Sequence, residues 1–332
     1  MTDVLFLTSG DVDDLVEPRE YVDAVWDAYR QRGGGAPAKP RTALVNGDPP
    51  GMLTTYAAIL PETGAMGGYM YSAGFGERDA WFVTPLFDAT SGELIAIVDG
   101  ASMNPYKTGA AGAVGVDALA REDAASVAVI GSGAQARGQL QMTATVRDLD
   151  AVSVFSPTAD HRQAFADEMT DRIDVPVHPV ESSAAAVENA DIVIAATNAS
   201  DPVFDGDLLA DGAHVTAMGQ YNPSKRELDD RTIERSVYVP DLRERVFEDA
   251  GSFLHALDAG VISEDHVHAE LGEVVAGEAP GRTAADQITV FDSGGTGIET
   301  VAAAHLLYER ARADGRGQTL EFAPASEALT GR

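Results

Sequence analysis

The stretch SVAVIGSGAQARGQLQMTATV, residues 126–146, joins an apolar strand to a helix through a glycine-rich turn. The turn contains the pattern Gly131-x-Gly133-x-x-Ala136. The first glycine permits a tight turn, the second lets the backbone approach a pyrophosphate, and the small third residue lets the helix pack on the strand. The helix N-terminus offers free N–H groups to an anion. The stretch therefore predicts a dinucleotide-binding loop whose contacts are Gly131, Gly133, Ala134, Gln135 and Ala136.

Strands and helices alternate after this loop. The segments VSVFSPTADHRQAFADEM and SSAAAVENADIVIAATN each contain a strand and a helix, and ITVFDSGGTG adds another apolar strand. Such alternation is typical of a parallel, doubly wound sheet. The first hundred residues instead contain several strand-like runs and one helix. Near the end, IETVAAAHLLYERARADG has apolar residues at helical spacing and predicts a final helix.

Further cofactor contacts are predicted where the strands end, because ligands of doubly wound folds bind at the carboxyl edge of the sheet. The second strand ends in Ser156-Pro157-Thr158, followed by His161 and Arg162, with no acid at its tip to bond a ribose 2′-hydroxyl. Hydroxyls beside an arginine suit a 2′-phosphate, so the expected cofactor is NADP or NAD, with NADP favoured. Alternatively, Arg162 lies on an exposed helix face. The other expected contacts are Thr108, Thr197, Asn198, Met218, Gly219 and Gly294.

The 332 residues include 53 acidic and 23 basic side chains, and the formal net charge is −30. A surface so negative repels nucleic acids and anionic membranes, so neither is an expected partner. The absence of cysteine excludes disulfides and thiolate metal sites, and the seven histidines show no ligand-like spacing, so no metal is expected. The sequence has no signal-peptide pattern at its start and no apolar run of about 18 residues. We therefore expect a cytoplasmic protein.

Only three lysines, Lys39, Lys107 and Lys225, accompany twenty arginines. Abundant acids with so little lysine indicate a halophilic protein, since molar salt shortens the Debye length to about 3 Å and screens repulsion between surface acids. A lysine that persists in the small-residue stretch MNPYKTGAAG, residues 103–112, is therefore a candidate functional group.

Six motifs resemble, in their order and spacing, those of one known family. They are Pro40-Arg41 on an early strand, Thr90-Ser91-Gly92, KTGAA at 107–111, the GSGAQA loop, GQYNPSKREL at 219–228 and TVFDSGGTGIETVAAAHLLY at 289–308. They cover nearly the whole chain and resemble the ornithine cyclodeaminase/mu-crystallin family of nicotinamide-dependent proteins.

The resemblance implies an α/β fold in which a Rossmann doubly wound parallel sheet domain is inserted in a mixed α+β domain. The NAD(P)-binding domain is expected over residues 122–297, and the substrate-binding and dimerisation domain over 1–121 plus 298–332. The implied enzyme is a homodimer that transfers hydride at the α-carbon of an imino, oxo or amino acid, as a ketimine reductase or an alanine dehydrogenase-like enzyme. The alternatives are ornithine-type cyclodeamination and non-catalytic binding of NADP or a small molecule.

Three positions depart from the pattern of this family. Met70 stands where the GxK motif has its lysine, Lys107 replaces the arginine before Thr-x-Ala-Ala, and Tyr221 replaces an aspartate of the cyclodeaminases. An acid is the natural partner for the δ-amine of ornithine. The changes therefore predict a poor ornithine cyclodeaminase.

The expected substrate-binding residues are Arg41, Met70 and Lys107, and the expected catalytic residues are Lys107 and Tyr221. The family resemblance places Arg41 at the substrate, and its guanidinium fork matches an α-carboxylate bidentately. Lys107 can hold a second anion or, when desolvated, transfer a proton. The phenol of Tyr221 can donate a proton or a hydrogen bond. Alternatively, Arg41 is an ordinary surface arginine, and Lys107 forms a structural ion pair.

Overall fold

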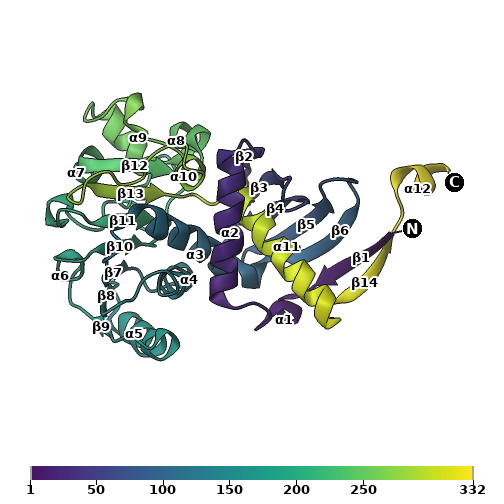
Figure 1. Ribbon diagram of the computed structural model, residues 1–332, viewed down its shortest axis with the longest axis horizontal. Helices are drawn as coiled ribbons and strands as arrows, with labels where there is room; N and C mark the ends of the chain where they lie inside the picture. The colour runs from purple at the N-terminus through teal and green to yellow at the C-terminus, as the bar shows by residue number, and fades with distance from the viewer. Residues whose placement is uncertain (1, 331–332) are drawn as a thin grey trace. The chain divides into compact units, whose positions relative to one another are not determined.

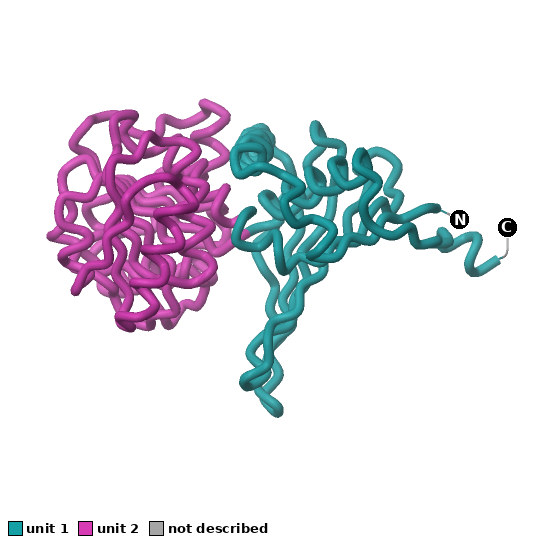
Figure 2. Tube along the Cα trace, turned by 90° about the horizontal axis from the view of Figure 1, so that it is seen from below, with its two compact units in different colours: residues 1–107, 296–332 teal, residues 108–295 magenta. Residues whose placement is uncertain are grey.

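The computed structural model describes residues 2–330, which form two compact units (Figure 2). Unit 1 comprises Met1–Lys107 and Thr296–Arg332, and unit 2 comprises Thr108–Gly295. The first division falls inside helix α3 (Gly100–Leu119), which begins in unit 1 and ends in unit 2. The sequence analysis placed this boundary later, at 121/122, and the second one at 297/298.

Unit 1 is built on a seven-stranded sheet in the order β14-β1-β6-β5-β4-β3-β2. Neighbouring strands pair antiparallel, except that β1 and β6 run parallel. The strands are β1 (Thr2–Leu7), β2 (Ala38–Gly47), β3 (Pro50–Leu60), β4 (Ala65–Ala73), β5 (Trp81–Asp88), β6 (Leu94–Asp99) and β14 (Gln318–Phe322). The other helices of this unit are α1 (Ser9–Val12), α2 (Pro18–Gly33), α11 (Gly297–Asp314) and α12 (Ala325–Thr330).

The two faces of this sheet differ in burial. Helix α11 packs on one face, and α2 packs against α11 and β3 (Figure 1). Because side chains alternate along a strand, the residues between the buried ones point to the opposite face. That face, which we call the open face, carries six exposed apolar side chains: Leu44, Leu53, Ile59, Met70, Trp81 and Val83.

Unit 2 is a Rossmann fold with seven parallel strands in the order β12-β13-β11-β10-β7-β8-β9. The strands are β7 (Ser126–Ile130), β8 (Ala151–Phe155), β9 (Val177–Pro179), β10 (Ile192–Ala195), β11 (His214–Ala217), β12 (Ser236–Pro240) and β13 (Ile288–Asp292). The α-helices are α4 (Ala134–Thr143), α5 (Ala159–Ile173), α6 (Ser183–Val187), α7 (Asp230–Arg235), α8 (Arg243–Asp249), α9 (Gly251–Asp258) and α10 (Leu271–Val275). Two 3₁₀ turns, η1 (Gly206–Leu208) and η2 (Glu264–His266), complete the unit.

The continuous apolar runs of β7, β10 and β13 arise because parallel strands are covered on both faces. The α/β fold class with a doubly wound parallel sheet is thus confirmed. The predicted final helix is α11, but the chain continues from it into β14, which pairs with β1, and into α12. Among residues 2–330, no helix is both long and apolar enough to span a membrane.

Candidate active site

The predicted glycine loop lies between β7 and α4, at the carboxyl edge of the unit 2 sheet. Gly131 has a φ of 116°, and a Cβ at this position would lie 2.4 Å from the carbonyl oxygen of Ala196. A Cβ on Gly133 would meet no atom within 4 Å. The first glycine is therefore required by the backbone conformation and by its packing against the end of β10, whereas the second leaves the loop open to a bound pyrophosphate.

A cavity of about 610 Å³ lies at this edge. It is bounded by the loop, the end of β8 and the end of β10, where the strand order reverses between β7 and β10. Dinucleotides bind at such a switch point, with the phosphates at the helix N-terminus. The lining includes eight predicted contacts: Gly131, Gly133, Ala134, Gln135, Ser156, Thr158, Thr197 and Asn198. The residues present therefore fit a nicotinamide dinucleotide.

The predicted contact Arg162 lies outside the lining of this cavity. Its guanidinium donates to the Ser156 carbonyl oxygen over 3.2 Å and to the Glu181 carboxylate over 2.9 Å. Arg162 therefore holds the loop after β8 in place and does not lie on an exposed helix face. The cavity lining contains Ser156, Thr158 and His161 near this loop and no acidic residue.

The other predicted contacts outside the lining are Thr108, Ala136, Met218, Gly219 and Gly294. The carbonyl oxygen of Thr108 accepts a hydrogen bond from the Gln139 side chain of α4 over 2.8 Å. Gly294 lies against the buried Arg245, whose side-chain carbon would be 3.0 Å from a Cβ at this position. A role of these five residues in cofactor binding stays a prediction.

Lys107 is buried in unit 1, with its side chain 1% exposed. Its Nζ atom lies 3.6 Å from Oε1 of Glu299, 4.9 Å from the centre of the Tyr69 ring and 5.9 Å from that of Tyr56. Burial lowers the pKa of Lys107; the Glu299 carboxylate opposes this shift, and the Arg41 charge adds to it. The side chain is thus a paired ammonium that releases its proton more readily than a surface lysine.

Glu299, the fully buried partner of Lys107, lies in the first turn of α11. Its carboxylate accepts hydrogen bonds from the backbone N–H and the hydroxyl of Thr296, each over 2.5 Å, in a capping box. Negative charge is also favoured at the N-terminus of a helix. The sequence analysis missed Glu299, although the pattern TGIE at residues 296–299 is a capping-box signal.

Arg41 lies in an irregularity of the β2–β3 pairing, between Lys39 and Thr42. Such bulges re-aim a side chain and are common next to active sites. Its Nη1 donates to the Tyr71 hydroxyl over 3.3 Å, and its Cζ lies 5.7 Å from the centre of the Tyr56 ring. Arg41 and Lys107 therefore both approach Tyr56.

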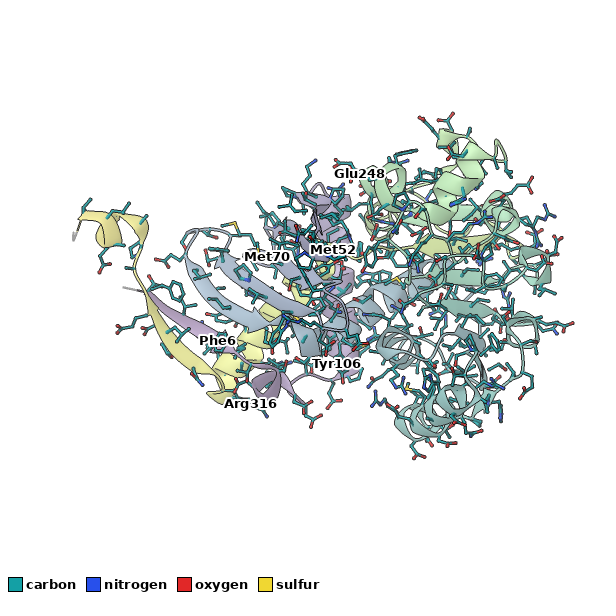
Figure 3. The ribbon with its side chains drawn as sticks, turned by 180° about the vertical axis from the view of Figure 1, so that it is seen from behind. Phe6, Met52, Met70, Tyr106, Glu248 and Arg316 are labelled. Atoms are coloured by element: carbon teal, nitrogen blue, oxygen red, sulfur yellow. The ribbon has the colours of Figure 1, made fainter. Side chains whose placement is uncertain are left out.

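Met70, which was predicted to bind the substrate, does not lie on the face of the sheet that carries Tyr69 and Tyr71. Its side chain is 46% exposed and belongs to the open face, where Figure 3 labels it on the sheet. Its neighbours on β4, Tyr69 and Tyr71, are buried on the other face and contact Lys107 and Arg41. The side chain that β4 offers to Lys107 is therefore Tyr69, an aromatic contact that the sequence analysis missed.

Tyr221 belongs to unit 2, in the segment between β11 and α7, and is 39% exposed. Its catalytic role stays a prediction. Within residues 2–330, no group of three or more His, Asp or Glu side chains is arranged to hold a metal ion.

The whole-chain comparisons agree with the motifs. The sequence matches the model of the Ornithine cyclodeaminase/mu-crystallin family over residues 3–315. A Delta(1)-pyrroline-2-carboxylate reductase of Bacillus cereus is 33% identical over 241 residues, which are 72% of this chain and 74% of that protein. The chain therefore belongs to the ornithine cyclodeaminase/mu-crystallin family.

Two solved structures share the fold over almost their full length. The Thermococcus litoralis Delta(1)-pyrroline-2-carboxylate reductase in complex with NADH and L-proline superposes with a TM-score of 0.90 at 32% identity, covering 96% of this chain and 100% of that one. An archaeal alanine dehydrogenase dimer with bound NAD superposes with a TM-score of 0.90 at 28% identity, covering 97% of this chain and 100% of that one. These relatives confirm the expected class: an NAD(P)-dependent oxidoreductase of this family.

Proposed function

We propose that this protein reduces a cyclic imino acid with one carboxylate, of the Delta(1)-pyrroline-2-carboxylate type, with a reduced nicotinamide dinucleotide. The observation that carries the proposal is the presence of two cations, Arg41 and buried Lys107, within 5.7 and 5.9 Å of the Tyr56 ring centre. The L-proline bound in the Thermococcus litoralis relative supports the same substrate class.

Each group has a chemical task in this reaction. Arg41 binds the substrate carboxylate with its guanidinium fork. A bound reduced nicotinamide supplies the hydride to the α-carbon. Lys107 donates a proton to the ring nitrogen and recovers it from solvent, so the imino acid becomes an amino acid. Glu299 favours the protonated form of Lys107 despite its burial. We also propose that the phenol of Tyr221 donates a proton or a hydrogen bond to the substrate.

The side chains of the unit 1 site support a substrate that carries a carboxylate. Arg41 and Lys107 bring two cationic groups to the Tyr56 ring, and a carboxylate is the anion that a guanidinium binds bidentately. The rings of Tyr69, Tyr71 and Phe82 lie 5.2–5.9 Å from one another beside these cations and suit a compact apolar ring. An open-chain 2-oxo acid aminated with ammonia has the same charge and is the second candidate.

We propose that NADP is preferred over NAD. The cavity lining offers the hydroxyls of Ser156 and Thr158 and the imidazole of His161 beside β8, and no carboxylate that would repel a 2′-phosphate. The test compares the Kd of NADPH with that of NADH, before and after Thr158→Asp. A preference for NADPH that Thr158→Asp reverses is expected, whereas tighter NADH binding by the wild type would contradict the proposal.

We propose a homodimer formed through the open face of unit 1. Exposed apolar patches of this extent mark interaction surfaces. The face also has a hollow of about 620 Å³ lined by Ala57, Ile59 and Gly68, where a partner side chain could be seated. Met70→Lys and Trp81→Lys should convert the dimer to a monomer in light scattering. A wild type that is monomeric at micromolar concentration would refute this proposal.

We propose that the protein works in a salt-rich cytoplasm, on the basis of its net charge of −30 and its three lysines. Its thermal midpoint should rise steadily with KCl up to the molar range, because salt screens the repulsion between surface acids. A midpoint insensitive to KCl would contradict a halophilic origin.

The function is tested by following NADPH and NADH oxidation in molar KCl. The substrates are Delta(1)-pyrroline-2-carboxylate, a six-membered cyclic imino acid, and pyruvate or glyoxylate with ammonia. Turnover should be greatest with a cyclic imino acid and should collapse in Arg41→Ala and Lys107→Met. The matched control is Arg19→Ala, which removes one exposed positive charge from unit 1. Cofactor binding without turnover on any substrate would instead identify a binding protein.

A further inference from the structure

Glu227 is a buried acid of unit 2 that the sequence analysis left without a function. Its side chain is 1% exposed, and it lies in the segment between β11 and α7. Neither the glycine loop nor the cavity lining includes it. No Lys, Arg or His side chain of residues 2–330 forms an ion pair with this acid, and a charged group is buried only when it is well bonded, so its burial needs a structural reason.

The carboxylate of Glu227 joins the ends of two neighbouring strands. Its Oε1 accepts a hydrogen bond from the backbone N–H of Thr197, over 2.6 Å, and its Oε2 accepts one from the backbone N–H of Gly219, over 2.8 Å. Thr197 follows β10 and Gly219 follows β11. A carboxylate has two acceptor oxygens and no donor, so it matches two N–H groups that point at one place.

The packing at this point leaves no room for a side chain on Gly219. A Cβ on Gly219 would lie 2.3 Å from the Thr197 carbonyl oxygen and 2.5 Å from Oε2 of Glu227. The Gln220 side chain also donates to that carbonyl oxygen, over 3.3 Å. Thr197 lines the cofactor cavity, as do the following residues Asn198 and Ala199. The Glu227 bridge is therefore bonded directly to the backbone of this cavity wall.

We propose that Glu227 is a positioning residue for the cofactor, which holds the Thr197 wall of the cavity against the loop after β11 and does so fully only as a carboxylate. The proposal rests on the proposed function only in that the cavity binds a nicotinamide dinucleotide. A protonated Glu227 would turn one acceptor oxygen into a hydroxyl, which cannot accept as well from the second N–H. One of the two bonds would then be weakened.

The ionisation of Glu227 falls in an accessible pH range. Burial raises its pKa to about 7, the bonds from Thr197 and Gly219 oppose the shift, and the charge of Asp292 at the end of β13 adds to it. Asp292 is itself bonded to Arg245 and to the Tyr238 hydroxyl. Cofactor affinity should therefore fall as pH decreases through 7. His161 is a titratable side chain of the cavity lining that Glu227→Gln leaves unchanged, so comparing the variant with the wild type separates its effect from that of Glu227.

The test measures the Kd of NADH and of NADPH by fluorescence between pH 5.5 and 8.5, without substrate. The variants are Glu227→Gln and, as a control for loss of a charge, the exposed Glu234→Gln. In the wild type and the control, Kd should rise about tenfold from high to low pH, as expected for weakening one bond to a charged group. In Glu227→Gln, Kd should be about tenfold higher than in the wild type at pH 8 and should not rise further as pH decreases.

A wild-type Kd that stays constant or falls with decreasing pH would overturn the proposal, and this measurement does not depend on the variant folding. A Glu227→Gln variant that retains the wild-type pH dependence would overturn it as well. In both cases the protein would still bind its cofactor, so the proposed function would stand. Failure of the wild type to bind either dinucleotide at any pH would overturn both.

Discussion

Replacing Lys107 with methionine should strongly destabilise unit 1, because the change removes one partner of a buried ion pair. Methionine keeps most of the side-chain length but leaves the Glu299 carboxylate, 0% exposed, without its ammonium. Breaking such a pair from one side costs about 3–5 kcal/mol of unfolding free energy. We expect about 3 kcal/mol, at the lower end of this range, because Glu299 keeps its two hydrogen bonds from Thr296.

The double variant Lys107→Met/Glu299→Gln separates the ion pair from simple packing. Glu299→Gln alone leaves the Lys107 ammonium buried without its carboxylate, so it should also destabilise. The double variant contains no unpaired charge and should lose only about 1 kcal/mol. The sum of the two single losses should therefore exceed the loss of the double variant by roughly 2 kcal/mol or more.

The assay is urea unfolding followed by tryptophan fluorescence. Both tryptophans, Trp26 and Trp81, belong to unit 1, so the signal follows the unit that contains the pair. Two single losses below about 1 kcal/mol that add up to the loss of the double variant would show that Lys107 and Glu299 are not paired, and would refute the reasoning.

Three predictions concern activity. The kcat/KM for the imino acid should fall as pH rises, and it should do so below the ordinary lysine pKa of 10.5, because burial lowers the pKa of Lys107. Lys107→Arg should move this fall in kcat/KM to higher pH. A fall at the same pH in the variant would exclude Lys107 as the proton donor. Arg41→Lys should raise KM about 10–100-fold with a smaller change in kcat, because a lysine cannot form the bidentate bonds to the substrate carboxylate. An unchanged KM would show that the substrate carboxylate does not bind to Arg41. Incubation with ornithine and NAD should form no proline above the enzyme-free control, and steady proline formation would contradict our interpretation of Tyr221.

The sequence predicts the local parts of this molecule well. The glycine loop is confined to a few consecutive residues, so the pattern around Gly131 predicts its turn and its open backbone, whereas the close packing of Gly131 against Ala196 appears only in the fold. The alternation of strands and helices likewise predicts the parallel sheet of unit 2, because each parallel connection needs a crossover.

The site around Lys107 depends on contacts that the sequence does not display. Glu299 comes from the far end of the chain, and only the folded unit brings it to 3.6 Å. For Met70 the cause is different: side chains alternate along a strand, so a motif placed one residue away falls on the opposite face. For Arg162, no local pattern indicated that its charge is engaged by Glu181.

The most direct test of the central claim is to reduce Delta(1)-pyrroline-2-carboxylate with a reduced nicotinamide dinucleotide that carries two deuterium atoms at C4, and to analyse the product by mass spectrometry and NMR. The account predicts proline with a single deuterium at its α-carbon, formed by the wild type and Arg19→Ala and not by Arg41→Ala or Lys107→Met. Proline without deuterium at the α-carbon, or no proline from any variant while the dinucleotide binds, would contradict hydride transfer at this site.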